Sequence, residues 1–470
     1  MYIPTIGLEV HAELKTKSKM FCGCPNDPHA SEPNTNICPV CLAHPGTLPV
    51  ANFAAVKNVI TFGMAVGGEI ATYSEFDRKN YFYPDIPKAY QISQYAFPFV
   101  KGGTLAGVAL TRVHLEEDTA RSQHDKGDYS LVDFNRAGVP LMELVTEPDI
   151  HDAKTAGNFA RELQLVLRSL GISDANMEKG EMRVEANVSV SNSGERAKKY
   201  VEVKNLNSFK SVEAAILFEI ERQISVIESG QIVEQETRGW DELKGKTFTQ
   251  RSKETAKDYR YFPDPDLPKL NLSEYSSLVI SREDEIFSKI PSKRRVMLTG
   301  LGITEASTEI ILQSAFLSEY VDNFLGLGLA RDPKIVTLAV NYLLTDLAPL
   351  AIEVPAGSKI LTPEHFALLI NALSEGKFTT RIAKDIIIAL ATNDADPLEY
   401  ARLNNLVVEV SAEMITLLID NVIAEHAMVV AEYKAGKTAS LQFLLGQAMK
   451  QSRGTIAPNL ISEALIKAIG

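Results

Sequence analysis

Apolar and polar residues alternate in short runs through the first part of the chain. Three of these runs are residues 6–14, IGLEVHAEL, residues 180–190, GEMRVEANVSV, and residues 199–206, KYVEVKNL. Successive side chains of a β-strand point to opposite faces of a sheet, so a period of two predicts strands with one face on a core. Clusters of Gly, Pro, Asn and Asp separate these runs as far as about residue 270, which predicts antiparallel strands joined by turns.

Two stretches within this region have the period of an amphipathic helix instead. One covers residues 153–171 and ends at Gly171, and the other begins at Ser208 and ends at Gly230. Serine is a common residue at the start of a helix, and glycine is common just after its end. A few helices among antiparallel strands predict the α+β class for residues 1–290.

The periodicity becomes almost wholly helical after the proline-rich run YFPDPDLPKL at residues 261–270. Residues 303–328 and 332–354 repeat apolar positions at helical spacing, and the polar stretch 393–405, NDADPLEYARLNN, has the composition of a second boundary. We therefore predict a mixed sheet domain over residues 1–290, an all-helical domain over 291–400 and a small helical tail over 401–470.

The polar faces of the predicted strands carry groups that are able to do chemistry. Alternation places Glu9, His11 and Glu13 on one face of the first strand, opposite Leu8, Val10, Ala12 and Leu14. The polar faces of the other two runs carry Glu181, Arg183, Glu185, Asn187 and Ser189, and Tyr200, Glu202 and Lys204. If these strands share one sheet, that face suits Mg²⁺, which prefers oxygen ligands, and phosphoryl transfer. A water-facing sheet without a function has the same pattern.

The run TRVHLEED at residues 111–118 leaves one side chain unplaced. Strict alternation groups His114 with Glu116 and puts Glu117 on the apolar side with Val113 and Leu115, unless a bulge intervenes.

Aromatic residues gather in EFDRKNYFYPDIPKAYQIS, residues 75–93, beside Arg78, Lys79 and Lys88. Such a mixture can stack a nucleobase and bind a phosphate, or it can form the buried rim of a sheet.

All four cysteines lie near the amino terminus, in the pairs FCGCP, with Cys22 and Cys24, and NICPVCL, with Cys38 and Cys41. Nothing else in the sequence indicates secretion, and clustered pairs of this kind in a cytosolic chain more often bind a metal than form disulfides. Four thiolates suit a tetrahedral structural Zn²⁺; the alternative is four reduced, unligated cysteines.

The formal net charge of −12 argues against non-specific binding of polyanions, because nucleic-acid affinity rests mostly on Lys and Arg. A local basic surface is still possible, since residues 434–462 contain no Asp or Glu but include Lys437, Lys450 and Arg453. An ordinary solvated helix face is the simpler interpretation. No stretch approaches the roughly 18 consecutive apolar residues of a membrane span, so we expect a cytoplasmic protein.

Several longer runs together resemble one known family. They are IGLEVHAELKTKSKMF, EPNTNICPVC, FDRKNYFYPDIPKAYQISQY, SLVDFNRAGVPLMELVTEPDI, VKNLNSFKSVEAAI, QETRGWD, DYRYFPDPDLP and LLGQAMKQSRG. In this order they are similar to the B subunit of the aspartyl/glutamyl-tRNA(Asn/Gln) amidotransferases, and the likeness covers essentially the whole chain.

The resemblance implies a fold and a reaction. The fold would be a glutamine-synthetase-like cradle, then a helical domain and a tail related to a small tRNA-binding module. The protein would use ATP and Mg²⁺ to phosphorylate the side-chain carboxylate of misacylated Glu-tRNA(Gln) or Asp-tRNA(Asn). The amidase, or A, subunit of the same heterotrimer would release ammonia, with a small C subunit as the third member. The ammonia would pass through an internal channel and displace phosphate.

The resemblance also implies roles for particular residues. It carries metal ligation onto Glu9, His11, Glu117, Glu185 and Glu202, and we add Lys79 and Lys204 to Glu9, His11 and Glu117 as catalytic candidates. The tail would bind tRNA through Lys437, Lys450 and Arg453. One departure is Glu185, which stands in VEAN where the family usually has Asp, so the carboxylate is kept with one more methylene.

Two other functions stay open at this point. The chain could be a noncatalytic tRNA-binding scaffold for the amidase, with the sheet as a docking surface. It could also be a ligase that acts on a free amino acid.

Overall fold

A computed structural model of the chain describes residues 2–123, 127–192, 197, 199–252, 258–275, 285–328, 332–352, 359–406, 412–452, 456 and 458–469. The chain divides into two compact units, Met1–Arg294 and Arg295–Gly470. The observed division therefore lies close to the predicted boundary at residue 290. We describe each unit by itself.

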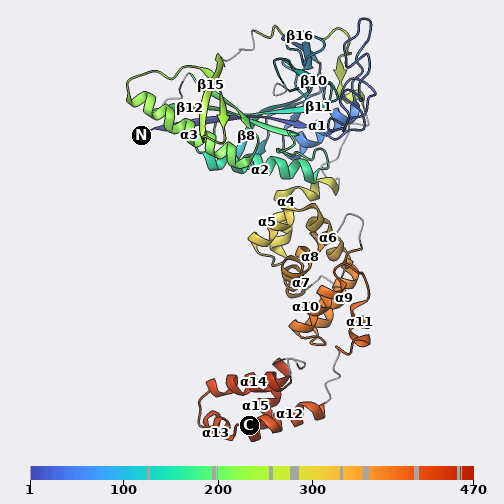
Figure 1. Cartoon of the computed structure of the whole chain (residues 1–470), viewed down its shortest axis with the longest axis vertical. Coiled ribbons are helices and arrows are strands. Elements are labelled where there is room, and N and C mark those ends of the chain that lie inside the picture. The colour runs from blue at the N-terminus through green and yellow to red at the C-terminus, as the bar shows by residue number, and fades with distance from the viewer. Residues whose placement is uncertain are drawn as a thin grey trace. The chain divides into compact units, whose positions relative to one another are not determined.

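A ten-stranded sheet forms the first unit, in the order β15-β14-β13-β12-β1-β11-β8-β6-β2 with β7 beside β8 (Figure 1). The strands are β1 (Ile3–Glu13), β2 (Glu69–Ile70), β6 (Val100–Lys101), β7 (Thr104–Leu105), β8 (Val108–Glu117), β11 (Pro140–Thr146), β12 (Met182–Ser191), β13 (Val201–Leu206), β14 (Glu236–Asp241) and β15 (Lys246–Ser252). The three alternating runs of the sequence are therefore β1, β12 and β13, which lie next to one another.

One pair in this sheet corrects the prediction of antiparallel strands. Every pair is antiparallel except β13 and β14, which run parallel. Two parallel neighbours need a crossover connection, and α3 (Phe209–Glu228) is the helix between them. The sheet is therefore mixed, and the class is mixed α and β.

Helices α1 (Phe53–Ala65), α2 (Ala153–Ser169) and α3 supply apolar side chains to the core of this unit. Figure 1 shows α2 and α3 along one side of the sheet, where α3 contacts α2, β12 and β13. The predicted caps are confirmed: the Ser208 side chain accepts a hydrogen bond from the Ser211 N–H, and Gly171 and Gly230 have φ of 67° and 76°. The core also contains Leu8, Val10 and Ala12, as the alternation of β1 predicts.

Three small sheets complete the unit. They are β9 (Arg121–Gln123) with β10 (Leu131–Asp133), β4 (Asp77–Asn80) between β5 (Tyr90–Ser93) and β16 (Phe262–Pro263), and β3 (Tyr73–Ser74) with β17 (Leu270–Asn271). Short 3₁₀ helices lie at Leu272–Glu274 and Glu285–Lys289.

All described elements of the second unit are helical. They are α4 (Pro291–Gly300), which begins just before the division, α5 (Glu305–Gln313), α6 (Ala315–Gly326), α7 (Pro333–Tyr342), a π-helical turn (Leu343–Leu347), α8 (Ala348–Ile352), α9 (Pro363–Ser374), α10 (Thr380–Leu390), α11 (Pro397–Leu403), α12 (Ala412–Glu425), α13 (Ala427–Lys434), α14 (Ala439–Gln451) and α15 (Pro458–Ile469). One apolar cluster extends from Leu298 to Ala401 and a separate one from Ile419 to Ile469. The second unit thus contains two separate hydrophobic cores.

The helical stretch Pro333–Ala351 has the length and composition of a membrane span. Its residues Val336, Val340, Leu343 and Leu347 are nevertheless buried in the core of the second unit. Burial on this scale is typical of the central helix of a packed helical domain.

Candidate functional site

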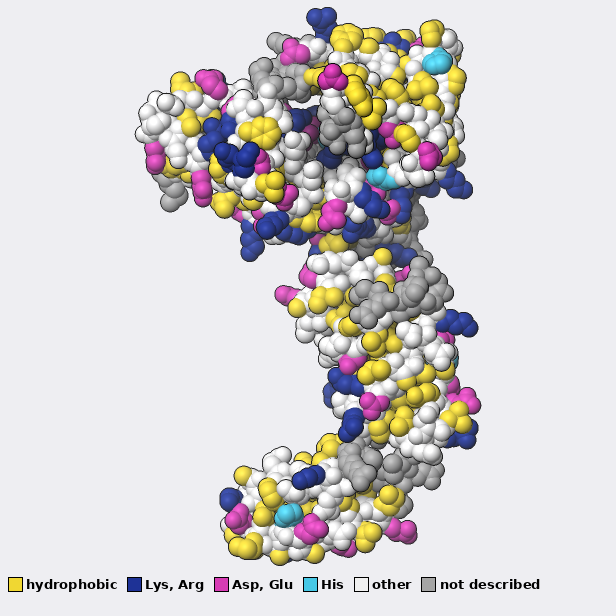
Figure 2. All heavy atoms as spheres, in the orientation of Figure 1, with side chains coloured by type: hydrophobic (Ala, Val, Ile, Leu, Met, Phe, Trp, Pro, Cys, Tyr) yellow, Lys and Arg dark blue, Asp and Glu magenta, His cyan; other side chains and the backbone are white. Residues whose placement is uncertain are grey.

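A cavity of about 520 Å³ lies on the polar face of the large sheet. Side chains from β1, β8, β11, β12 and β13 line it, and so do residues of β4 and the segment at Tyr259 and Tyr261. Pairing across the strands places Glu143 opposite both His11 and His114, and Glu9 opposite Glu185. Of the predicted site residues Glu9, His11, Lys79, Glu185, Glu202 and Lys204 line this cavity. Figure 2 shows that positively and negatively charged side chains are interspersed over the visible face of the first unit.

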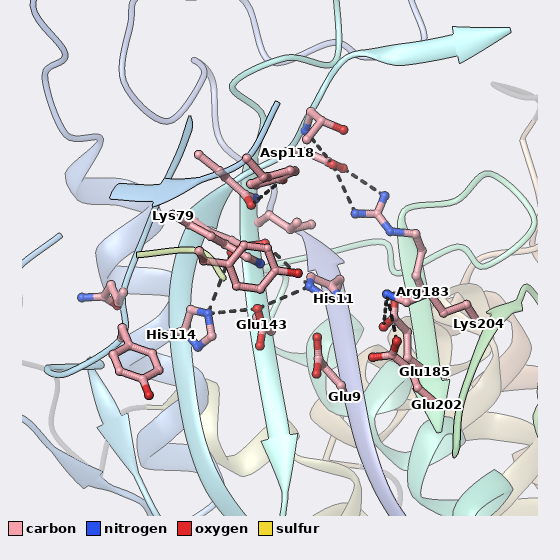
Figure 3. A pocket seen from close by; sticks show the side chains of 18 of the residues that line it. Glu9, His11, Lys79, His114, Asp118, Glu143, Arg183, Glu185, Glu202 and Lys204 are labelled. Atoms are coloured by element: carbon pink, nitrogen blue, oxygen red, sulfur yellow. Dashed lines mark hydrogen bonds and ion pairs between the residues drawn. The ribbon is translucent and has the colours of Figure 1, made fainter. Parts of the chain in front are cut away.

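Two histidines and two glutamates form a compact group, which we call the histidine–carboxylate cluster: His11, His114, Glu116 and Glu143. The Glu143 Oε2 atom lies 3.4 Å from His11 Nε2 and 3.0 Å from His114 Nε2. In Figure 3 the two imidazoles lie on either side of this carboxylate. Glu9, His11 and Glu143, and likewise His114, Glu116 and Glu143, bring ligand atoms within 4.8 Å of one another, which is close enough to hold a metal ion.

The electrostatics of this cluster favour the charged form of His11 and the ionised form of Glu143. Burial by itself favours the neutral imidazole, but the Glu143, Glu116 and Glu9 carboxylates outweigh it and raise the pKa of His11 to about 9. His114 and then His11 hold the pKa of Glu143 well below its usual value despite its burial. A buried site that already concentrates acids in this way is suited to a cation.

Glu9 behaves differently from its neighbour Glu143. Burial, followed by the charges of Glu143 and Glu185, raises the pKa of Glu9 to about 7. A cation between these acids would favour its ionised form, since an opposite charge nearby lowers the pKa of a carboxyl group.

A second group of charges lies across β1 from the first (Figure 3). Lys204 Nζ lies 2.7 Å from Glu185 Oε2 and 3.9 Å from Glu202 Oε2, and the Thr237 hydroxyl donates to Glu202 at 2.7 Å. The pKa of Lys204 is raised: burial opposes the charge, but Glu185 and then Glu202 outweigh it. The predicted ligands Glu185 and Glu202 therefore lie beside a lysine, whereas His11 belongs to the histidine–carboxylate cluster and Glu9 lies beside His11 and Glu143.

Lys79 reaches the cavity from β4. Its Nζ atom lies 5.1 Å from the centre of the Tyr259 ring and 5.9 Å from that of Tyr81. Burial works against its charge, but Glu116 and other neighbours raise its pKa well above the usual value. Lys79 is thus a fixed positive charge inside an aromatic wall, and Tyr95 and Tyr261 stack beside it with their ring centres 4.6 Å apart.

Glu117 is not brought together with the other predicted ligands. Alternation is regular from Arg112 to Glu117 of β8, past a register shift at Thr111, so Glu116 lines the cavity while Glu117 lines a separate pocket of about 210 Å³. There its Oε1 atom lies 2.7 Å from Lys88 Nζ and accepts the Ile92 N–H at 2.9 Å. The assignment of Glu117 to the metal group therefore does not fit the structure, because no bulge turns this side chain toward His11.

Two further residues of the site were missed from the sequence. Glu143 is the one charged residue in the apolar run PLMELVT, and that isolation was its only local signal. Asp118 pairs with Arg183, whose Nη1 and Nη2 atoms lie 3.0 and 3.2 Å from its two carboxylate oxygens. Burial opposes ionisation, but Arg183 and then Arg136 hold the pKa of Asp118 below its ordinary range.

The four cysteines come together as the sequence predicts. Their Sγ atoms lie within 4.8 Å of one another, and the Cys38 N–H donates to Cys41 Sγ at 3.2 Å. A hydrogen bond with Cys22 is the main cause that lowers the pKa of Cys41 to about 5. Four thiols at this spacing could hold a metal ion such as zinc.

The predicted tRNA-binding residues lie in the second unit. Lys437 precedes α14 and pairs with Glu432 at 2.8 Å, and Lys450 is in the last turn of α14. Arg453 lies outside the described residues.

The mixed sheet, with acids, imidazoles and lysines gathered in one cavity, has the character of a catalytic domain. A family model described as the GatB/GatE catalytic domain matches residues 4–277, and one described as the GatB domain matches residues 320–469. The chain belongs to the GatB/GatE family.

Several bacterial proteins named as the B subunit of aspartyl/glutamyl-tRNA(Asn/Gln) amidotransferase are similar to this chain. The one from Thermus thermophilus is 41% identical over 483 residues and 100% of both chains. The one from Thermomicrobium roseum is 43% identical over 484 residues and 98% of both chains. The one from Gloeothece citriformis is 38% identical over 494 residues, which cover 100% of this chain and 98% of the relative. The resemblance found from the sequence motifs is thereby confirmed.

Proposed function

We propose that this protein is the ATP-dependent subunit of a tRNA-dependent amidotransferase, a ligase that forms a carbon–nitrogen bond with glutamine as the amide donor. Its substrate is the misacylated Glu-tRNA(Gln), the misacylated Asp-tRNA(Asn), or both. One observation carries the proposal: acids, imidazoles and two lysines line a single cavity of about 520 Å³ in a chain that is related over its whole length to such subunits.

The reaction has two steps. A side-chain carboxylate oxygen of the substrate attacks the γ-phosphorus of ATP, and ADP leaves, which gives an acyl phosphate. Ammonia then attacks the acyl carbon, phosphate leaves and the nitrogen loses a proton, which gives the amide. The first step brings two anions together, so it depends on positive charge held in place around them.

The cavity has groups for that purpose. Glu9, His11 and Glu143, and likewise His114, Glu116 and Glu143, would hold Mg²⁺, because the ligand atoms of each group lie within 4.8 Å of one another. A bound ion would displace the proton from the histidine of its group. When bound, the ion supplies charge neutralisation for the phosphates. Lys79 and Lys204 are catalytic candidates because both keep a raised pKa although they are partly buried, so each remains a positive charge beside the acids at neutral pH.

Ammonia needs a route into the cavity that keeps it apart from bulk water. A small pocket shares Lys88 and Glu117 with the 210 Å³ pocket at the cysteine loop, and shares Gln91, Asp118 and Thr119 with the main cavity. We infer that these three spaces form the route for ammonia from the amidase, or A, subunit of a heterotrimer whose third member is a small C subunit. The Lys88–Glu117 ion pair would then line the ammonia route, away from the metal.

Other parts of the proposal rest on the family. The first unit would be a glutamine-synthetase-like cradle, and the region from about residue 401 would be a tail that binds tRNA through Lys437 and Lys450. The cysteine cluster would hold a structural zinc, and the complex would work in the cytoplasm.

Replacing Glu9 or His11 by Ala tests the proposal. In the complex with its amidase partners, either change should abolish the conversion of Glu-tRNA(Gln) to Gln-tRNA(Gln) and the associated ATP hydrolysis, while tRNA binding stays near normal. Glu178→Ala is a matched control, because this glutamate is exposed and lies outside the cavity.

The two other functions give different results in the same assay. A noncatalytic scaffold would show no ATP consumption that depends on misacylated tRNA. A ligase for a free amino acid would amidate free glutamate without tRNA. Loss of tRNA binding with normal ATP turnover in Glu9→Ala would contradict the assignment of this residue to catalysis.

A further inference from the structure

Lys19 is a lysine whose side chain is completely buried, with an exposed fraction of 0%. Lysine is almost never fully buried unless it is paired, because burial removes the water that stabilises its charge. Lys19 lines neither the main cavity nor the pockets of the proposed ammonia route. The reaction therefore does not explain why a charged residue occupies this position.

Lys19 contacts both cysteine pairs. Its backbone N–H donates to the Cys24 carbonyl at 3.0 Å, and its Nζ atom lies 4.0 Å from Cys41 Sγ. Nζ also donates to the Phe134 carbonyl at 3.1 Å. The backbone at Gly138 packs over both side chains, since a Cβ there would lie 3.6 Å from Lys19 Cδ and 3.8 Å from Cys41 Cβ. The ammonium group is thus enclosed between the cysteine cluster and the segment 134–138.

The partners of this ammonium group differ from those of other lysines in the first unit. Lys88 and Lys204 each pair with a glutamate at 2.7 Å. Among the described residues, the Lys19 ammonium pairs instead with a carbonyl oxygen and a sulfur. A carbonyl carries only a partial negative charge, so the group that can supply a full one is the thiolate of Cys41.

A metal ion in the cysteine cluster would make the charge of Lys19 useful. Four thiolates and one Zn²⁺ sum to a net charge of about −2, and burying such a centre is costly unless nearby groups compensate it. The Lys19 ammonium would offset part of that charge, and the Cys38 N–H, which donates to Cys41 Sγ at 3.2 Å, acts in the same sense. Four neutral thiols would leave the buried ammonium uncompensated.

We propose that Lys19 is the positive counter-charge of the cysteine metal site, where it stabilises the metal-bound thiolates and Cys41 most directly. The inference rests on the structural zinc of the proposed function and adds to it a positioning residue outside the four ligands. Residues next to metal ligands commonly tune affinity in this way. The proposal also explains why a lysine is buried here, although an uncharged side chain of similar length would fill the same space.

Lys19→Met and Lys19→Gln test this role in the complete complex. Both remove the charge; methionine keeps a long unbranched side chain, and glutamine also keeps N–H donors for the Phe134 carbonyl. Each should lower the affinity for Zn²⁺ about tenfold to a hundredfold, the usual effect of losing a partner outside the ligands. Competition with a chromogenic chelator under reducing conditions measures the affinity, and elemental analysis gives the stoichiometry.

Lys17→Met is the matched control, because it makes the same change at an exposed lysine two positions away, and it should leave the affinity unchanged. Trp240 fluorescence verifies folding, and Lys19→Gln carries the test if Lys19→Met does not fold. Wild-type affinity in the folded Lys19 variants would overturn the inference. So would wild-type affinity in Lys19→Gln alone, since the hydrogen bond to Phe134 and not the charge would then be what matters.

Amidation of Glu-tRNA(Gln), measured in the same preparations, separates this inference from the proposed function. A wild-type complex that amidates but holds no zinc would overturn the role of Lys19 and leave the amidotransferase function intact. A zinc-loaded wild-type complex without ATP-dependent amidation would contradict that function, while a loss of zinc affinity in the Lys19 variants would still support the inference.

Discussion

The Asp118–Arg183 pair allows a quantitative test of the electrostatics of the cavity wall. In Asp118→Asn the guanidinium loses two short contacts to a carboxylate that is only 4% exposed. Removing one partner of a fully buried pair costs about 3–5 kcal/mol. Because the side chain of Arg183 is 31% exposed and partly hydrated, we expect a smaller loss, about 2–3 kcal/mol in the free energy of unfolding.

The assay is urea unfolding followed by the fluorescence of Trp240. This is the single tryptophan of the chain and lies in β14, so its signal reports the first unit. A chain with two units need not unfold in one step, and a probe in one unit avoids that complication.

Asp174→Asn is the matched control for this measurement. Asp174 pairs with Lys15 at 2.7 Å, but the two side chains are 62% and 55% exposed, so the loss should be only about 0–1 kcal/mol. Equal losses in the two variants would refute the argument that burial makes the Asp118 pair matter.

The pH dependence gives an independent test of the same pair. Arginine holds the pKa of Asp118 below its ordinary value of 3.8, so its contribution is complete above that pH and is lost as the pH falls below it. The difference between wild type and Asp118→Asn should therefore shrink as the pH falls below about 4. A difference that grew on acidification would contradict the assigned sign.

Three further predictions concern the other predicted groups. Glu116→Gln should lower the rate of amidation at least a hundredfold. Glu117→Gln should leave the Mg²⁺ dependence of ATP hydrolysis unchanged, but it should change the rate of glutamine-dependent amidation more than that of ammonia-dependent amidation. Steady-state rates with each nitrogen source test both predictions. Cys38→Ser should lose stoichiometric zinc by elemental analysis and unfold at lower urea, because metal binding contributes to folding. Changing Lys437 and Lys450 together to Ala should weaken tRNA binding and flatten its salt dependence. An unchanged affinity in filter binding would show that the lack of Asp and Glu in residues 434–462 is incidental.

Much of the site could be predicted from local pattern. Alternation alone put Glu9 and His11 on one face of a strand with Leu8 and Val10 on the other, and that division is observed. The same rule separated Glu116 from Glu117 correctly. The family resemblance assigned a ligand role to Glu117 against this rule. In the structure Glu117 lies on the side that the alternation predicts.

The rest of the site depended on contacts between distant parts of the chain. Asp118 and Arg183 are 65 positions apart, so no spacing in the sequence indicates their pairing. Glu143 became part of the cluster only because β11 lies between β1 and β8. A charged residue in an apolar run is a weak signal until its partners are known.

The sequence by itself determined the strands, the capped helices, the cysteine cluster and the family, because each depends on neighbouring residues or on long matching runs. The tertiary structure decided which strands are adjacent and which acids lie close enough together to hold a cation. It also decided that α3 crosses over, so that β13 and β14 run parallel. The physical reason is that periodicity sets the face on which a side chain lies, whereas the position of that face against others depends on how the whole sheet packs.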